Sequence, residues 1–196
     1  MDILKLGPKT ASYVPELAAF YEVELGHLRG MYGLDEIIGF KAGRDLELLH
    51  EVASGNTQRE IYIALGVDGF LEGVLEVNEH KDVLMIGDIL WIIAGQKGAG
   101  IGSQMLDHYL AETSVDIAIC GVRNLNVAPK ALFTGRGFEE TVRLENKSYY
   151  GKGLTDAGKQ RMEVLRERFV RQHSLSYRLT SRFLPDFDGI LEGLSL

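Results

Sequence analysis

The sequence predicts an α/β (α+β) fold in which helices pack on a mixed β-sheet. Apolar residues recur at helical spacing over residues 10–30, which predicts an amphipathic helix. From residue 61 onward, apolar residues form strand-like runs, and Asp68-Gly69 between the first two predicts a hairpin turn. The predicted elements of the middle of the chain follow in the order ββββαβαββ, which is typical of a mixed sheet with helices packed on it.

Each element has its own pattern. Helices are expected over residues 10–30, 44–53, 100–112, 127–134 and about 155–173, and strands over residues 61–65, 70–77, 83–93, 116–122, 138–144 and 146–150. Pro15 suits the start of the first helix, where its missing N–H costs little. Thr155 or Asp156 can cap the last helix. A composition shift near residues 151–153 predicts a domain over residues 1–150 and a C-terminal extension over residues 151–196, a helix followed by an apolar tail.

Composition and charge exclude several classes of protein. The net charge of −7 argues against nonspecific binding of nucleic acid. The sequence contains no run of about 18 uncharged apolar residues, so no membrane-spanning helix is expected. The single cysteine, Cys120, excludes an internal disulfide, and its apolar surroundings predict a buried structural thiol. The five histidines lack metal-ligand spacing, so we expect no metal. With no signal peptide at the start, a cytoplasmic protein is expected.

The segment Lys97–Ser103, KGAGIGS, joins a predicted strand to a predicted helix. Its alternating glycines permit positive φ angles and a close approach by a ligand, and the free N–H groups of the new helix attract an anion. The P-loop pattern is absent, and the glycine spacing differs from that of a Rossmann loop. A tight turn without a ligand remains the alternative interpretation.

Two blocks resemble the GNAT superfamily of N-acetyltransferases. The loop resembles that family's acyl-CoA loop, [QR]-x-x-G-x-[GA], with Lys97 in place of Gln or Arg and with Gly100 and Gly102 matching. Residues 126–139, which begin with Asn126 and end in Gly-Phe-Glu, resemble its second block. The resemblance covers roughly residues 60–150. It implies a GNAT-like, mostly antiparallel central sheet of six to seven strands flanked by helices.

The resemblance also implies acetyl-CoA as co-substrate and a set of residues that bind it. Backbone groups of Ile92 and Ile93 would bind the pantetheine arm, the loop amides would hold the pyrophosphate, and the Asn126 block would line the far side of the arm. The implied cofactor-binding residues are Ile92, Ile93, Lys97, Gly98, Ala99, Gly100, Ile101, Gly102, Ser103, Asn126 and Phe133.

Catalysis in that family needs a route that deprotonates the amine and a proton donor for the leaving thiolate. Phe133 stands where the family usually has a donor tyrosine, and phenylalanine cannot donate. Tyr149 is the expected substitute, with Tyr150 as an alternative, although both could simply pack on the sheet. Asp88 is the candidate base, since burial in an apolar strand would raise its pKa; the alternative is an outward-facing residue. Glu72 and Glu76 are expected on a solvated face, with Glu76 the better candidate of the two.

Two functions follow from these observations. The first is an N-acetyltransferase that moves an acetyl group from acetyl-CoA to a primary amine of a small molecule or peptide by direct attack. The second is a catalytically weak or inactive GNAT-fold protein, such as a virion or other assembly component. In that case the C-terminal extension would bind partners or a second copy of the chain. Neither function involves nucleic acid or a membrane.

Overall fold

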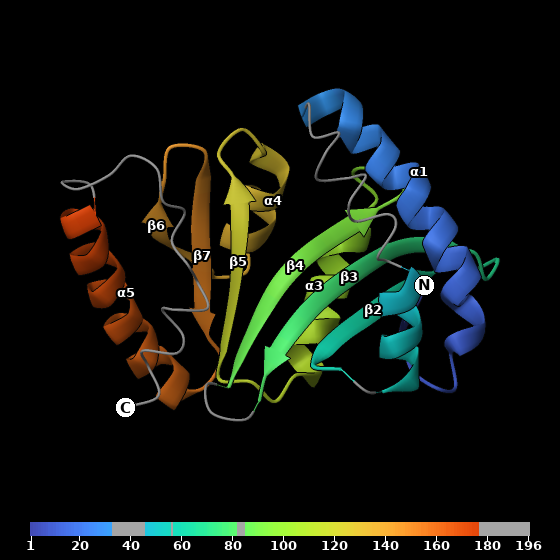
Figure 1. The fold of residues 1–196 in the computed structure, drawn as a ribbon, viewed down its shortest axis with the longest axis horizontal. Helices are drawn as coiled ribbons and strands as arrows, with labels where there is room; N and C mark the ends of the chain where they lie inside the picture. The colour runs from blue at the N-terminus through green and yellow to red at the C-terminus, as the bar shows by residue number, and fades with distance from the viewer. Residues whose placement is uncertain (33–45, 56, 82–84, 177–196) are drawn as a thin grey trace. The chain divides into compact units, whose positions relative to one another are not determined.

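The computed structural model describes residues 1–32, 46–55, 57–81 and 85–176 of the chain. In this part of the chain seven strands form one sheet in the order β1-β2-β3-β4-β5-β7-β6 (Figure 1). The pairs β1–β2, β2–β3, β5–β7 and β6–β7 are antiparallel, and β4–β5 is parallel. The expected mixed, mostly antiparallel sheet flanked by helices is therefore confirmed.

The elements begin and end close to the predicted positions. The strands are β1 Asp2–Lys5, β2 Arg59–Leu65, β3 Leu71–His80, β4 Ile86–Ala94, β5 Ile117–Arg123, β6 Glu139–Arg143 and β7 Lys147–Gly153. The helices are α1 Val14–Tyr32, α3 Ile101–Glu112, α4 Val127–Thr134 and α5 Asp156–Ser176, with a short 3₁₀ turn at Ala11–Tyr13 and a further helix over residues 46–54. The predicted start of that further helix, residues 44 and 45, lies outside the described residues.

The predicted order grouped four strands directly before α3, although residue ranges were assigned to only three of them, and this grouping was wrong. Only β2, β3 and β4 lie between the N-terminal helices and α3, and the remaining strand is β1 at the start of the chain. Strand β1 has four residues, too few to show a period in the sequence. It forms because it pairs along its whole length with β2, from Asp2 opposite Leu65 to Lys5 opposite Tyr62.

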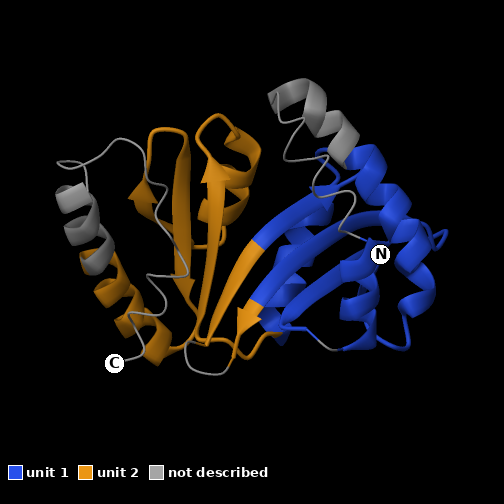
Figure 2. Cartoon of the chain, in the orientation of Figure 1, with its two compact units in different colours: residues 1–78, 90–112 blue, residues 79–89, 113–196 orange. Residues whose placement is uncertain are grey.

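The chain divides into two compact units (Figure 2). Unit 1 comprises Met1–Asn78 and Leu90–Glu112. Its core combines α1 and the helix over residues 46–54 with alternate residues of β2 and β3, among them Val14, Leu17, Leu49, Ile61, Ile63 and Val74. Helix α3 covers the other face of these strands, where Tyr62 makes edge-to-face contacts with His108 and Tyr109.

Unit 2 comprises Glu79–Ile89 and Thr113–Leu196, of which residues 82–84 and 177–196 are not described. Its core is formed by Ile86, Ile117, Ile119, Met162 and Leu165, with Val142 packed against it. Helix α5 therefore covers the face of β5 that carries Ile117 and Ile119.

The expected C-terminal helix is confirmed as α5, and Thr155 is its cap, because Gly158 N donates to Thr155 Oγ1 at 3.0 Å. Strand β7 continues to Gly153, beyond the domain boundary predicted at residue 150. That boundary stays a prediction. The apolar tail was expected from residue 174, but α5 continues to Ser176, and residues 177–196 lie outside the described residues. No helix in the described ranges is long and apolar enough to cross a membrane.

Candidate functional site

The glycine loop connects β4 to α3 in unit 1. Gly98 and Gly100 have φ angles of +80° and +79°, a region in which any other residue type would be strained. A side-chain carbon added to Gly98 would meet nothing within 4 Å, and one added to Gly100 would meet only Gln104 Nε2 at 3.8 Å. Lys97 and Ala99 are exposed as well. The backbone thus needs glycine for its conformation, and the space above it is open.

The start of α3 supplies backbone donors next to this space. Gln104 N donates to Gly100 O at 3.0 Å, which is the first bond of the helix. The amides of Ile101, Gly102 and Ser103 precede it and so have no partner within the helix. An anion above the loop would meet these three N–H groups and the positive end of the helix dipole.

Glycine at position 73 of β3 lets α3 approach the sheet closely. A side-chain carbon there would lie 2.7 Å from Ile101 Cγ2 and 3.1 Å from Ile93 O. The loop is held at its other end by Gly95 N, which donates to Glu72 O at 2.9 Å. The side chain of Ile101 is therefore an anchor, and only its amide remains available to a ligand.

The end of β4 lies at the edge of the sheet of unit 1, whose strands run in the order β1-β2-β3-β4. The parallel pairing of β4 with β5 covers Ile86–Ile89, so Leu90–Ala94 extend beyond it. The side chain of Ile93 packs in the core beneath α1, whereas Ile92 is half-buried. An edge strand can pair its backbone with an extended ligand, which is the role predicted for Ile92 and Ile93.

Unit 2 brings both predicted catalytic residues to one face of its sheet. Asp88 pairs in register with Ile119, which lies on the α5 side of β5. Gly121 is two residues further along β5 and pairs with Tyr149 of β7. Because alternate strand residues share a face and register partners lie side by side, Asp88, Gly121 and Tyr149 all point to the α5 side. Asp88 is half-buried, neither fully buried nor fully exposed.

A lysine that the sequence analysis did not single out lies beside Tyr149. Lys147 Nζ is 4.6 Å from the centre of the Tyr149 ring, a cation–π arrangement. A side-chain carbon on Gly121 would lie 2.5 Å from Lys147 Nζ and 3.1 Å from Tyr149 Cε1, so the glycine makes room for both side chains. Two signals were available: Lys147 and Tyr149 are two residues apart on one strand and so share a face, and a glycine such as Gly121 inside a buried strand often marks a close approach.

Tyr150 points to the opposite face of β7 and is committed to a structural network. Its hydroxyl donates to Glu140 Oε2 at 3.2 Å, and Arg143 forms two bonds to the same carboxylate, at 2.7 and 2.9 Å. The bonds from Arg143 hold the pKa of Glu140 below its usual range, while burial and the bond to Glu140 raise the pKa of Tyr150. Of the two tyrosines, only Tyr149 shares a face with Asp88.

The second block places Asn126 and Phe133 on α4. Asn126 occupies the N-cap position, where its backbone N donates to Arg123 O at 2.9 Å and its side chain forms no capping bond. Its side chain is half-buried. Phe133 is only 4% exposed and packs edge-to-face on Phe138, with ring centres 5.1 Å apart. Its role in binding a cofactor stays a prediction.

Among the acidic candidates, the expectation for Glu76 was wrong. Its carboxylate is buried, with a residual exposure of 5%, because α1 covers this face of β3. Arg59 Nη1 lies 2.6 Å from Glu76 Oε1, and the Tyr21 hydroxyl donates to Oε2 at 3.3 Å. The face of β3 that was predicted to be solvated is therefore covered, and the buried carboxylate of Glu76 is paired with a positive charge. Glu72 is half-buried.

Cys120 is buried, as expected for a structural thiol, and burial raises its pKa. In the described ranges no group of three or more His, Cys, Asp or Glu side chains could hold a metal ion.

Comparison with known proteins gives the fold. No protein-family model matches the sequence, and neither does any curated protein sequence. Among solved structures, a GNAT-family acetyltransferase from Staphylococcus aureus is 17% identical, with a TM-score of 0.59 over 79% of this chain and 99% of that one. PaiA N-acetyltransferase from Thermoplasma acidophilum, solved with coenzyme A, is 17% identical with the same TM-score over 78% of this chain and 99% of that one.

A ribosomal-protein-alanine N-acetyltransferase from Brucella melitensis is also similar, at 17% identity and a TM-score of 0.53 over 78% of this chain and 99% of that one. At these identities the likeness shows the fold alone. The chain therefore has the GNAT fold that its two sequence blocks predicted.

Proposed function

We propose that the protein is an N-acetyltransferase that moves an acetyl group from acetyl-CoA to a primary amine. The observation that carries the proposal is the open glycine loop, in which Gly98 and Gly100 have positive φ and leave free space in front of the first amides of α3. The GNAT fold supports it, and one protein of this fold was solved with coenzyme A.

The loop residues have separate tasks in this function. The amides of residues 98–103 would bind the pyrophosphate oxygens, and the exposed ammonium of Lys97 would neutralise part of their charge. Backbone groups of Ile92 and Ile93, on the edge of unit 1, would pair with the pantetheine arm. The uncommitted side chain of Asn126 would line the far side of the arm.

The two catalytic candidates lie on the same face of unit 2. Asp88 would accept the proton that the attacking amine loses, directly or through water. Tyr149 would donate a proton to the departing thiolate, the task for which Phe133 has no O–H group. The acceptor is a primary amine of a small molecule or peptide. The expected cytoplasmic location stays a prediction.

A catalytically silent GNAT-fold protein is the second candidate function, and Phe133 favours it. Its ring is buried against Phe138, and a phenylalanine at the usual donor position offers no hydroxyl. In that case the extension would bind an assembly partner or another copy of the chain. Removal of residues 177–196 tests this function: unchanged assembly state and solubility would count against it.

Replacement of Gly100 by valine tests whether the glycine loop binds acetyl-CoA. We expect Gly100→Val to abolish measurable acetyl-CoA binding, because the side chain would fill the space above the loop and φ near +79° is strained for valine. Isothermal titration calorimetry with acetyl-CoA on folded protein measures it.

Gly69→Val is the matched control for that experiment. Gly69 has a φ of +81° in the hairpin between β2 and β3, so the strain is alike, at about 1–2 kcal/mol. We expect this variant to keep its affinity. Retained binding in Gly100→Val, or no binding by the wild-type protein, would refute the loop assignment.

A further inference from the structure

We propose that Lys147 binds a carboxylate of the acceptor, so that the amine acetylated by this protein is an amino acid or a similar short aminocarboxylate. This inference rests on the proposed acetyltransferase function. The structural feature behind it is the position of the Lys147 ammonium, which lies over the Tyr149 ring and above Gly121 on the face that also carries Asp88.

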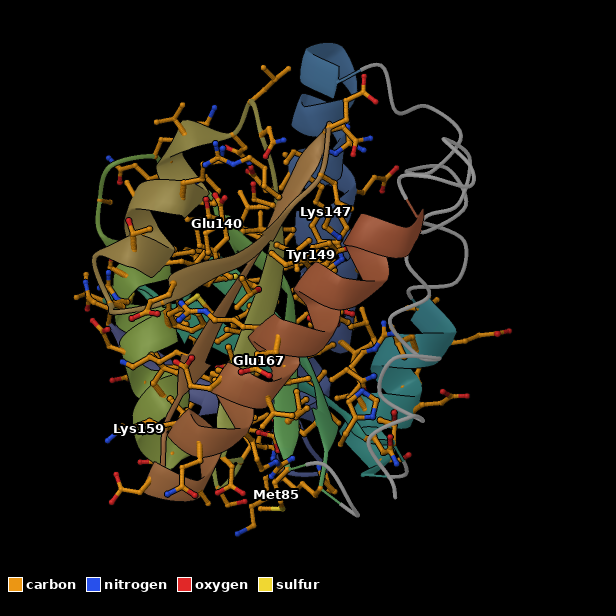
Figure 3. All side chains as sticks on the ribbon, turned by 90° about the vertical axis from the view of Figure 1, so that its left-hand side faces the viewer. Met85, Glu140, Lys147, Tyr149, Lys159 and Glu167 are labelled. Atoms are coloured by element: carbon orange, nitrogen blue, oxygen red, sulfur yellow. The ribbon has the colours of Figure 1, made fainter. Side chains whose placement is uncertain are left out.

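The side chain of Lys147 lies along the sheet, over Gly121 and beside the ring of Tyr149. Lysine is a strongly hydrated, flexible side chain that usually carries its charge into water. Here Lys147 is half-buried, and its terminal carbon and nitrogen occupy the space that a side chain on Gly121 would take. Figure 3 shows Lys147 and Tyr149 next to each other on β7. The Tyr149 ring and the space above Gly121 together fix the position of the Lys147 ammonium.

The charge of Lys147 has no ion-pair partner within the described parts of the chain, although the protein as a whole is acidic. Two other lysines of unit 2 are engaged. Lys159 pairs with Asp156 at 2.9 Å, and Lys152 Nζ donates to Arg136 O at 2.7 Å. Burial and the charge of Asp88 raise the pKa of Cys120, whereas the charge of Lys147 lowers it, so the charges of Asp88 and Lys147 act on the same part of the sheet. A half-buried cation without a direct ion pair is a ready partner for an anionic ligand.

The spacing between Lys147 and Asp88 suits a short aminocarboxylate. Asp88 and Gly121 lie on adjacent strands, two residues apart in register. With strands about 4.8 Å apart and a rise of about 3.3 Å per residue, their side-chain positions are roughly 8 Å apart. A carboxylate bound to the ammonium above Gly121 would place an amine one or two carbons away within reach of Asp88. The proposed base and the anion site would then hold opposite ends of one acceptor.

Matched pairs of acceptors test the inference on the full-length protein. Each amino acid is compared with the amine that lacks its carboxylate: serine with ethanolamine, leucine with isoamylamine, phenylalanine with phenethylamine. The measurement is the initial rate of thiol release from acetyl-CoA. For the wild-type protein we expect kcat/KM to be at least tenfold higher for the carboxylated member of each pair.

Substitutions of Lys147 test whether this lysine causes the preference for carboxylated amines. In Lys147→Met we expect the preference to fall below about threefold through a higher KM, with kcat changed little, and Lys147→Arg should restore it. Lys159→Met, which removes an exposed lysine of the same unit, is the control and should keep the preference (Figure 3). A weaker affinity for acetyl-CoA in Lys147→Met would instead assign Lys147 to the coenzyme phosphates and overturn the inference.

A binding measurement separates this inference from the proposed function. In ¹³C-lysine-labelled protein, the Lys147 ε-carbon resonance is assigned by its loss in Lys147→Met and followed during titration with serine and with ethanolamine. We expect a saturable shift with serine alone, even if no acetyl transfer occurs. Turnover without preference for carboxylated amines would overturn the inference and leave the acetyltransferase function standing. The absence of a serine-dependent shift would overturn the inference by itself.

Discussion

At the scale of single residues, the two adjacent tyrosines of β7 separate catalysis from stability. Tyr149 shares a face with Asp88, whereas the Tyr150 hydroxyl is bound to Glu140 at 3.2 Å on the other face. We expect Tyr149→Phe to lower kcat for acetyl transfer by about 10²-fold or more, the typical effect of removing a general acid. Tyr150→Phe should leave kcat unchanged and lower the free energy of unfolding by about 1 kcal/mol.

Steady-state kinetics and urea unfolding of both variants check this assignment. Equal loss of activity in the two variants would mean that the hydroxyls act through the fold and not on the reaction.

Sequence patterns predicted single residues well where backbone conformation decides and poorly where burial decides. Gly98 and Gly100 were identified because only glycine suits a strand-to-helix turn of this kind, and both have positive φ. Glu76 was placed on a solvated face because alternation of polar and apolar residues does not show whether water or a helix covers the polar side. In the structure α1 covers this face of β3. Lys147 was missed because the space above Gly121, which its side chain occupies, reaches it only through the pairing of β5 with β7, although strand alternation already puts Lys147 and Tyr149 on one face.

At the scale of elements, α5 packs so closely on the rest of unit 2 that glycine is required at its first turn. Gly158 lies against the backbone of Asp116, and a side-chain carbon there would collide with the Asp116 carbonyl oxygen. Thr155 Oγ1 donates to Asp116 Oδ1 at 2.7 Å, which holds the same turn in place.

Gly158→Ala should therefore destabilise the protein although alanine is the better helix former by about 1 kcal/mol. We expect a loss of about 1–3 kcal/mol in the free energy of unfolding, as for overpacked cores. The exposed Gln160→Ala on the same helix is the control and should change stability by less than about 0.5 kcal/mol. Stabilisation by Gly158→Ala would show that α5 can move away from β5 at little cost.

Helices and strands were predictable where the spacing of apolar residues within the element itself indicates its type. Helix α4 begins and ends at the predicted residues, and α3 differs by one residue at its start. Strand β1 was not predicted, because its four residues are too few to show an alternation of apolar and polar positions. The strand forms through its pairing with β2. The order of β7 and β6 in the sheet is likewise a property of long-range pairing, which a linear pattern does not contain.

At the scale of the whole molecule, the position of the C-terminal boundary is open to test by truncation. Met162 and Leu165 of α5 complete the core that contains Ile86, Ile117 and Ile119. Removing residues 154–196 would uncover these isoleucines and remove two buried side chains worth about 1.5–3 kcal/mol each. That loss is a large share of an ordinary domain stability of about 5–15 kcal/mol.

We expect a chain that ends at residue 153 to lose cooperative unfolding or solubility, because it ends before α5. A chain that ends at residue 176 keeps α5 and should melt within a few degrees of the full-length protein. Thermal unfolding followed by circular dichroism, with light scattering for the assembly state, compares the two. If the shorter chain melts cooperatively at the full-length temperature, α5 is an appendage and the domain ends near residue 150. If only the shorter chain fails, α5 belongs to the domain, and any partner-binding role is confined to residues 177–196.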